Sequence, residues 1–256
     1  MKHSTPLLIL ICIISLRFQA QVISIGLDAD QKTMSFKTGD DVLSHVHQTY
    51  RNGPCKAYTF SQTNTHYRND SMTGTSEWHE AVEFPDKFRI DFGDKATGNY
   101  VIFRNDSSYR YKHFELRGKK YDANILLLVL GGMYYRELSD VTARLRKGGY
   151  NTTILSKQKW NKQHVYVIGA EAGDLNSNQI WISKKTGRVA RIIERMEGND
   201  MMDMTFDSHQ DHCKGYVETK VTFKRNGKIE QVEEYHHIQT VEKFPEEVFD
   251  PAPVKK

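Results

Sequence analysis

The residues best suited to chemistry stand together in one polar segment late in the chain. The stretch Asp207–Cys213 contains two histidines, two aspartates and a cysteine, and His236 follows on a later predicted strand. Histidine, carboxylate and thiolate groups are zinc ligands, so His209, His212 and His236 could serve a metal-dependent hydrolase. No CxxC or HExxH spacing is present, however, and polar loops between strands collect such residues readily. We therefore expect a solvated loop, with no metal site and no cofactor.

A second group with possible chemistry consists of Glu77, Glu80 and Glu83. Paired carboxylates carry out acid–base catalysis in glycosidases. On a strand, Glu77 and Glu83 share one face, while Glu80 lies on the other face with Trp78. An exposed strand face accounts for these acids without catalysis. Because the chain also lacks a glycine-rich phosphate loop and a nucleophile elbow, we expect no catalytic residues and a protein that is not an enzyme.

The elements that position these residues are mostly strands with one apolar face. Alternation of apolar and polar residues predicts about eleven antiparallel strands. The Asn226-Gly227 pair between the last two is the strongest hairpin signal, and no βαβ alternation interrupts the series. The predicted strands lie near residues 58–63, 78–84, 88–92, 100–104, 109–113, 165–168, 179–182, 189–196, 201–206, 216–223 and 229–236.

Three helices are predicted among these strands. Thr38 and Asp41 form a capping box before a helix over 40–50, and an amphipathic helix is expected over 137–147. Between them, residues 122–133 read as a helix that is apolar nearly all round, and Gly131-Gly132 favours a hinge or kink near its end. A sheet protein with one apolar helix in mid-chain suggests that this helix covers an apolar cavity, although a helix that fills the sheet permanently is the alternative.

The first twenty residues resemble a secretory signal peptide, with a basic start, an apolar core and a polar exit. Its apolar core of about ten residues is too short to span a bilayer, so we expect export and no transmembrane span. Residues 21–256 then form a single domain with a core over about 40–250. The net charge of +4 is small and interleaved with acids, which argues against nucleic-acid binding. Cys55 and Cys213 remain after processing, and the sequence leaves open whether they pair.

Three stretches together resemble those of a known family. They are Phe84–Phe92, with a Pro-x-x-Phe-Arg pattern; Val101–Tyr111, with an Asn-Asp turn before an aromatic strand; and Gln179–Arg191, with a tryptophan strand, a turn and an arginine strand. They look like motifs of the LolA-like proteins, which are periplasmic outer-membrane lipoprotein carriers and related lipid-binding proteins of Gram-negative bacteria. The resemblance covers roughly residues 40–250. It implies an incomplete antiparallel β-barrel of about eleven strands, covered by helices, whose interior takes up acyl chains.

The resemblance also implies a function and a place in the cell. We expect a monomeric, non-enzymatic carrier of the periplasm that binds the acyl chains of a lipid or lipoprotein, and outer-membrane lipoprotein sorting is the role that the resemblance implies. The alternative is an envelope lipid-sensing or scaffolding protein that binds a protein partner through its sheet. The residues expected to line the apolar cavity and its lid are Phe60, Trp78, Phe84, Phe88, Ile90, Phe103, Tyr109, Leu127, Leu128, Leu130, Met133 and Trp181.

One residue departs from the family pattern. Carriers of this family commonly have an arginine immediately before the proline of the third-strand motif, where it holds the lid through backbone carbonyls. Phe84 occupies that position here. The predicted lid should therefore be held by apolar contact, and energised lipoprotein transfer does not follow from the resemblance.

Overall fold

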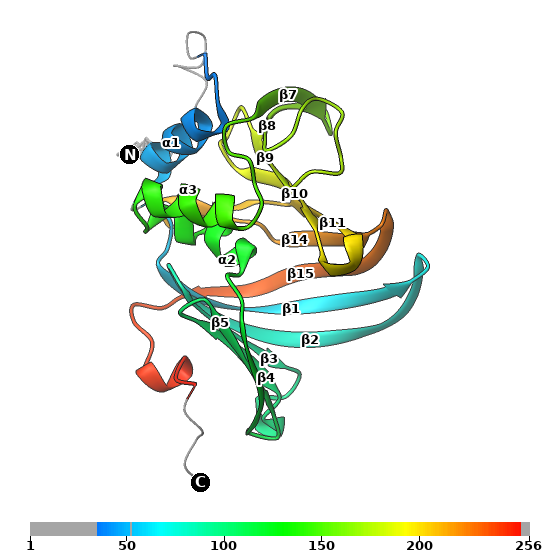
Figure 1. Cartoon of the computed structure of the whole chain (residues 1–256). Helices are drawn as coiled ribbons and strands as arrows, with labels where there is room; N and C mark the ends of the chain where they lie inside the picture. Colours follow the sequence, from blue (N-terminus) through cyan, green and yellow to red (C-terminus); the bar gives the residue numbers. More distant parts are fainter. Residues whose placement is uncertain (1–34, 52, 252–256) are drawn as a thin grey trace, which may run out of the picture.

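A single curved sheet forms most of the molecule (Figure 1). The computed structural model describes residues 35–51 and 53–251, so the predicted signal peptide lies outside the described residues. Thirteen antiparallel strands follow one another in the order β6-β5-β4-β3-β2-β1-β15-β14-β11-β10-β9-β8-β7. Because β6 and β7 end this order without pairing to each other, the sheet stays open, as predicted for an incomplete barrel.

The strands of the sheet, with the separate hairpin β12–β13, have the following bounds: β1 Ala57–Arg68, β2 Ser71–Glu83, β3 Lys87–Phe92, β4 Tyr100–Arg104, β5 Ser107–Lys112, β6 Glu115–Tyr121, β7 Leu155–Trp160, β8 Gln163–Ile168, β9 Gln179–Ser183, β10 Val189–Arg195, β11 Met201–Asp207, β12 Gln210–His212, β13 Gly215–Val217, β14 Lys220–Arg225 and β15 Lys228–Thr240. The helices are α1 Gly39–Tyr50, α2 Ile125–Leu130 and α3 Leu138–Lys147, and short 3-10 turns are η1 Lys95–Thr97, η2 Gly132–Tyr134, η3 Glu197–Asn199 and η4 Glu246–Val248.

The predicted number of strands was too low because the two edge strands were missed. β6 has no buried residue, and β7 alternates charged and partly buried residues. Strands at sheet edges carry lysines and other charges that discourage pairing with a second molecule. Such strands lack the apolar alternation by which interior strands are recognised. The stretch predicted as one strand over 216–223 also divides into β13 and the start of β14.

Tight turns join many of the neighbouring strands and fix their register. Both central residues have positive φ at Asn69-Asp70 (50° and 60°), Asn105-Asp106 (51° and 53°) and Asn226-Gly227 (50° and 81°). Two-residue turns of this kind match the right-handed twist of a hairpin, and asparagine, aspartate and glycine tolerate them best. The turns predicted at Asn105-Asp106 and Asn226-Gly227 are therefore confirmed, and Asn69-Asp70 forms a third turn of the same kind.

The helices pack together against β8–β11 and form the main apolar core. The Thr38 hydroxyl accepts from the backbone N–H of Asp41, whose carboxylate accepts from the backbone of Thr38 in return, which confirms the capping box. α3 ends at Lys147, as predicted, and Gly148 caps it. The helix expected over 122–133 was wrong in length, because α2 ends at Leu130 and a single 3-10 turn follows Gly131. None of the helices in the described ranges is long and apolar enough to cross a membrane.

The convex face of the sheet carries a second, smaller core. The irregular segment after β15 returns across this face, where Phe244 and Phe249 pack against aromatic residues of β4 and β5. Beneath the segment, Arg89 forms a bidentate ion pair with Asp91 and lies 4.1 Å from the centre of the Tyr100 ring. The phenylalanines of the C-terminal segment thus hold it against the sheet.

Candidate ligand-binding cavity

An apolar cavity lies between α2 and the concave face of the sheet. Its volume is about 270 Å³. Alternate residues of β1, β2 and β3 form its floor, α2 forms one wall, and residues from β14 and β15 and the link before β14 complete it. The period of two along each strand directs one set of side chains into the cavity and the other set to the convex face.

Most of the residues predicted to form a cavity are brought together here. Eight of the twelve line the same space; seven come from β1–β4 and α2, and Phe84 lies in the turn after β2. They are Phe60, Trp78, Phe84, Phe88, Ile90, Phe103, Leu127 and Leu130.

The other four predicted residues lie elsewhere. Leu128 and Met133 are buried in the main core beneath the helices. Tyr109 packs at the edge of the convex core. Trp181 belongs to a separate cluster in which its indole N–H donates to Gln179 Oε1 at 2.8 Å and the Arg191 guanidinium lies 4.5 Å from its ring centre. Leu128 still lies on α2, the predicted lid, and Met133 in the turn that follows it. Strand alternation shows which residues share a face, but both faces of this sheet are covered in places, so apolar character alone could not place Tyr109 and Trp181.

Both sides of α2 adjoin open space. Leu126, Leu127 and Leu130 face the cavity, whereas Ile125 and Leu128 line a second, more open groove of about 560 Å³. Leu126 borders both spaces, as do Phe103, Asn124 and Phe223. The cavity and the groove therefore adjoin each other along this six-residue helix.

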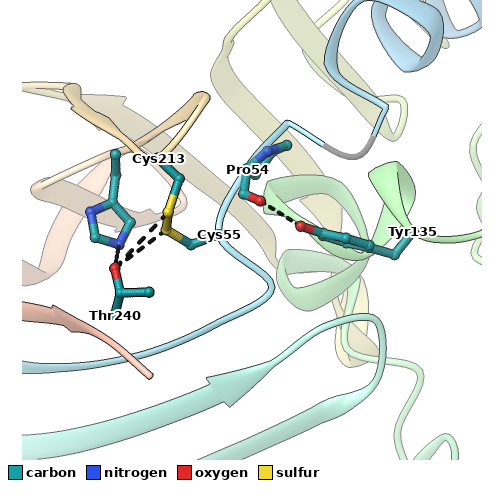
Figure 2. Close-up of a disulfide and its surroundings, with 6 residues drawn as sticks. Pro54, Cys55, Tyr135, Cys213 and Thr240 are labelled. Atoms are coloured by element: carbon teal, nitrogen blue, oxygen red, sulfur yellow. Dashed lines mark hydrogen bonds between the residues drawn. A yellow bond between two sulfur atoms is a disulfide. The ribbon is translucent and has the colours of Figure 1, made fainter. Parts of the chain in front are cut away.

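Phe84 holds the end of α2 by apolar contact. A Cβ atom built on Gly131 would lie only 2.0 Å from the Phe84 ring, so the ring packs directly on the glycine backbone. The ring also stacks with Tyr135, at 6.3 Å between centres. The Tyr135 hydroxyl in turn donates to the carbonyl oxygen of Pro54, next to the Cys55–Cys213 disulfide (Figure 2). Gly131 is thus required for close packing with Phe84, whereas the sequence had suggested only that this residue forms a hinge or kink.

The sequence did not identify three acidic residues in this cavity. Glu80, Glu218 and Glu233 line it and are only 5%, 6% and 8% exposed. Burial raises the pKa of the Glu218 carboxyl to about 8 and that of Glu233 to about 7. The pKa of Glu80 is also raised well above its usual value, by burial first and then by the nearby charge of Glu233. The predicted orientation of Glu80 beside Trp78 was the one available signal.

The histidines that suggested a hydrolase have different partners. His209 contacts the Val189 carbonyl and the Tyr216 ring, whereas His236 bonds the Glu77 carboxylate at 2.7 Å. Within the described ranges, only Cys55, His212 and Cys213 lie close enough together to hold a metal ion. The two cysteines form a disulfide in the structure, so their sulfurs are not available as thiolate ligands.

Comparison with known proteins finds solved structures of similar fold. No family model matches the sequence, and no curated protein matches it at a significant level. Among solved structures, a DUF1329 family protein from Desulfovibrio piger superposes with a TM-score of 0.59 at 14% identity, over 83% of this chain and 95% of that one. A LolA superfamily protein from Nitrosomonas europaea gives 0.55 at 10% identity, over 83% and 97%.

A third solved structure is a domain assigned to outer-membrane lipoprotein sorting, from Vibrio parahaemolyticus. It superposes with a TM-score of 0.53 at 11% identity, over 81% of this chain and 94% of that domain. The three superpositions and the open antiparallel sheet agree with the fold that the sequence resemblance implied. The described chain has a LolA-like fold, an incomplete antiparallel barrel covered by helices.

Proposed function

We propose that this protein is a non-enzymatic carrier of the periplasm that takes acyl chains of a lipid or lipoprotein into the cavity beside α2. The observation that carries the proposal is the cavity itself, which is walled mainly by aromatic and aliphatic side chains from six strands, β1–β4, β14 and β15, and from α2. The similar fold of a domain assigned to lipoprotein sorting supports the same function.

The size and lining of the cavity suit an alkyl chain. Apolar cavities of about 150 Å³ bind benzene in an engineered protein, and this cavity measures about 270 Å³. Each methylene that leaves water contributes about 0.8 kcal/mol, so a chain of moderate length would bind through burial alone. The groove on the other side of α2 offers space for the rest of a longer ligand.

Two features support a periplasmic location. The first twenty residues have the layout of a secretory signal peptide, and the fold contains a disulfide between Cys55 and Cys213. Disulfides persist in oxidising compartments such as the bacterial periplasm and are rare in the cytosol.

Trp78 provides a direct test, because it is the one tryptophan of the three in the chain that lines the cavity. In a protein carrying Trp160→Phe and Trp181→Phe, 12-bromododecanol should quench the remaining Trp78 fluorescence saturably, because bromine quenches indoles on contact. The matched control is Trp78→Phe with the other two tryptophans retained, which should show little quenching. Native mass spectrometry of the untreated protein should also reveal a bound lipid that solvent extraction removes.

Absence of saturable quenching, together with a ligand-free native mass, would refute the carrier proposal. Equal quenching of the control would place the alkyl chain outside this cavity and would also count against it.

A further inference from the structure

Three carboxyl groups stand in a cavity that is otherwise apolar. Glu80 comes from β2, Glu218 from the link between β13 and β14, and Glu233 from β15. An alkyl chain needs none of them, and a carboxyl group buried in apolar surroundings is destabilising unless it has a partner. Their presence therefore points to a polar part of the ligand.

Two of these carboxyls have no side-chain partner in the described structure. Burial and the charge of Glu233 are the only influences on the pKa of Glu80, and Glu218 interacts with its own backbone N–H. Glu233 alone is well bonded, because it accepts from Gln231 at 2.7 Å and from the Tyr235 hydroxyl at 2.8 Å. Glu80 and Glu218 thus retain free acceptor oxygens toward the cavity.

The other titratable groups around the carboxyls are tyrosines. Burial raises the pKa of each of these tyrosines, and the charge of nearby glutamates raises it further. All three glutamates act on Tyr235, Glu80 and Glu218 act on Tyr58, and Glu218 acts on Tyr134 and Tyr216. Within the part of the chain that the structure describes, no lysine, arginine or histidine contributes to the pKa of any of the three. The cavity therefore holds acidic groups without a resident cation.

The spacing of the carboxyls favours an organic cation over a metal ion. Their oxygens do not form a group compact enough to be a candidate metal site in the described ranges, and calcium or magnesium requires several oxygens at about 2.0–2.6 Å. An alkylammonium group is larger, donates up to three hydrogen bonds and has an apolar chain attached. Its chain would occupy the aromatic part of the same cavity.

We propose that the cavity selects an amphiphile whose apolar chain carries a protonated amine, with Glu80 and Glu218 as its counter-ions and Glu233 in support. The inference rests on the proposed carrier function, since the chain is held by the apolar walls. It further specifies that neutral and anionic amphiphiles of the same chain length bind more weakly. Binding is non-covalent, and each carboxyl that pairs with the protonated amine releases its own proton to the solvent.

The pH dependence has a definite sign. At pH 6 Glu218 and Glu233 hold their protons in the empty cavity, because their pKa values are about 8 and about 7. An ammonium ligand must displace these protons, so its affinity should rise with pH, by up to about tenfold per unit for each proton released. The part of the rise that comes from Glu218 should end near pH 8–9, where this carboxyl is already ionised.

The test compares dodecylamine, dodecanol and dodecanoate by displacement of 12-bromododecanol from Trp78. Dodecylamine should bind at pH 8 roughly tenfold or more tightly than dodecanol, because charge-assisted hydrogen bonds are about twice as strong as neutral ones. Its advantage should shrink at pH 6, and dodecanoate should bind most weakly. The double variant Glu80→Gln/Glu218→Gln, which keeps the side-chain volume, should lose the preference for the amine and still bind dodecanol.

The control variant is Glu234→Gln, next to Glu233 on β15, where the side chain is 58% exposed and pairs with Lys220. It should retain the full preference. Equal affinities of wild type for dodecylamine and dodecanol, or a preference that survives the double substitution, would overturn the inference and leave the carrier function standing. Failure of dodecanol itself to bind would instead refute the carrier function.

Discussion

Replacing Glu218 by glutamine should change how the stability of the fold depends on pH. The ordinary pKa of a glutamate is 4.5, and in the folded protein burial raises that of Glu218 to about 8. Between these two values the folded state holds a proton that the unfolded state has lost. The contribution of this proton to the free energy of unfolding is fully present below pH 4.5 and is lost as the pH rises to about 8.

The magnitude follows from the same two values. One pH unit of difference corresponds to about 1.4 kcal/mol, so the interval from 4.5 to about 8 corresponds to about 5 kcal/mol. This is a large share of the roughly 5–15 kcal/mol that stabilises a typical domain. Glutamine resembles the protonated acid and cannot ionise. Glu218→Gln should therefore match the wild type at pH 5 and exceed its free energy of unfolding by up to about 5 kcal/mol at pH 9.

Urea unfolding at pH 5, 7 and 9, followed by circular dichroism without reductant, measures this difference. Glu234→Gln is the matched control, because its exposed side chain should leave the pH profile unchanged. If the wild type and Glu218→Gln show parallel profiles from pH 5 to pH 9, the carboxyl is not buried as described and the reasoning is refuted.

Three further substitutions test the packing. Gly131→Ala should lower the free energy of unfolding by about 1–3 kcal/mol, because the added methyl would overlap the aromatic ring that packs on this residue; thermal unfolding measures the loss. Cys55→Ala/Cys213→Ala should cost about 2–5 kcal/mol in urea unfolding, because the disulfide joins residues 158 positions apart. Arg89→Leu should cost about 3–5 kcal/mol by the same assay, since it leaves the Asp91 carboxylate, 7% exposed, without its bidentate partner.

Each of these substitutions has its own control. Phe84→Leu should recover part of the loss caused by Gly131→Ala, and a simple sum of the two single losses would argue against direct contact. Reductant should destabilise the wild type and leave the double cysteine variant unaffected; an equal effect on both would contradict a formed disulfide. The double variant Arg89→Leu/Asp91→Leu should be more stable than Arg89→Leu alone, because it removes the unpaired charge.

Local sequence signals predicted the elements of the fold well wherever their cause is local. The capping box at Thr38 and Asp41 depends on residues three positions apart. The turns at Asn105-Asp106 and Asn226-Gly227 depend on residues that tolerate positive φ. Interior strands show the period of two because one face contacts the core. The edge strands β6 and β7 were missed because exposure of an edge replaces that pattern with charges.

The site was predicted in part for the same reason. Trp78, Phe88 and Phe103 were placed in the cavity because alternation and apolar character are visible along the chain. Trp181 was misplaced because both faces of β9 are buried, and no local pattern distinguishes the two sides of such a strand. The resemblance implied that Phe84 stands where carriers of the family have an arginine, but only the packing showed that the Phe84 ring lies against Gly131.

By itself, then, the sequence determined a series of antiparallel strands, their tight turns, and an apolar helix in mid-chain that had to be covered; only the family resemblance implied that the sheet is open. The tertiary structure alone decided that Glu80, Glu218 and Glu233 meet in one cavity, because the pairing of β2 with β1, of β1 with β15 and of β15 with β14 brings together residues up to 153 positions apart. A carboxyl group's charge state depends on what surrounds it. Those surroundings are formed by distant segments and leave no trace in the residues next to it.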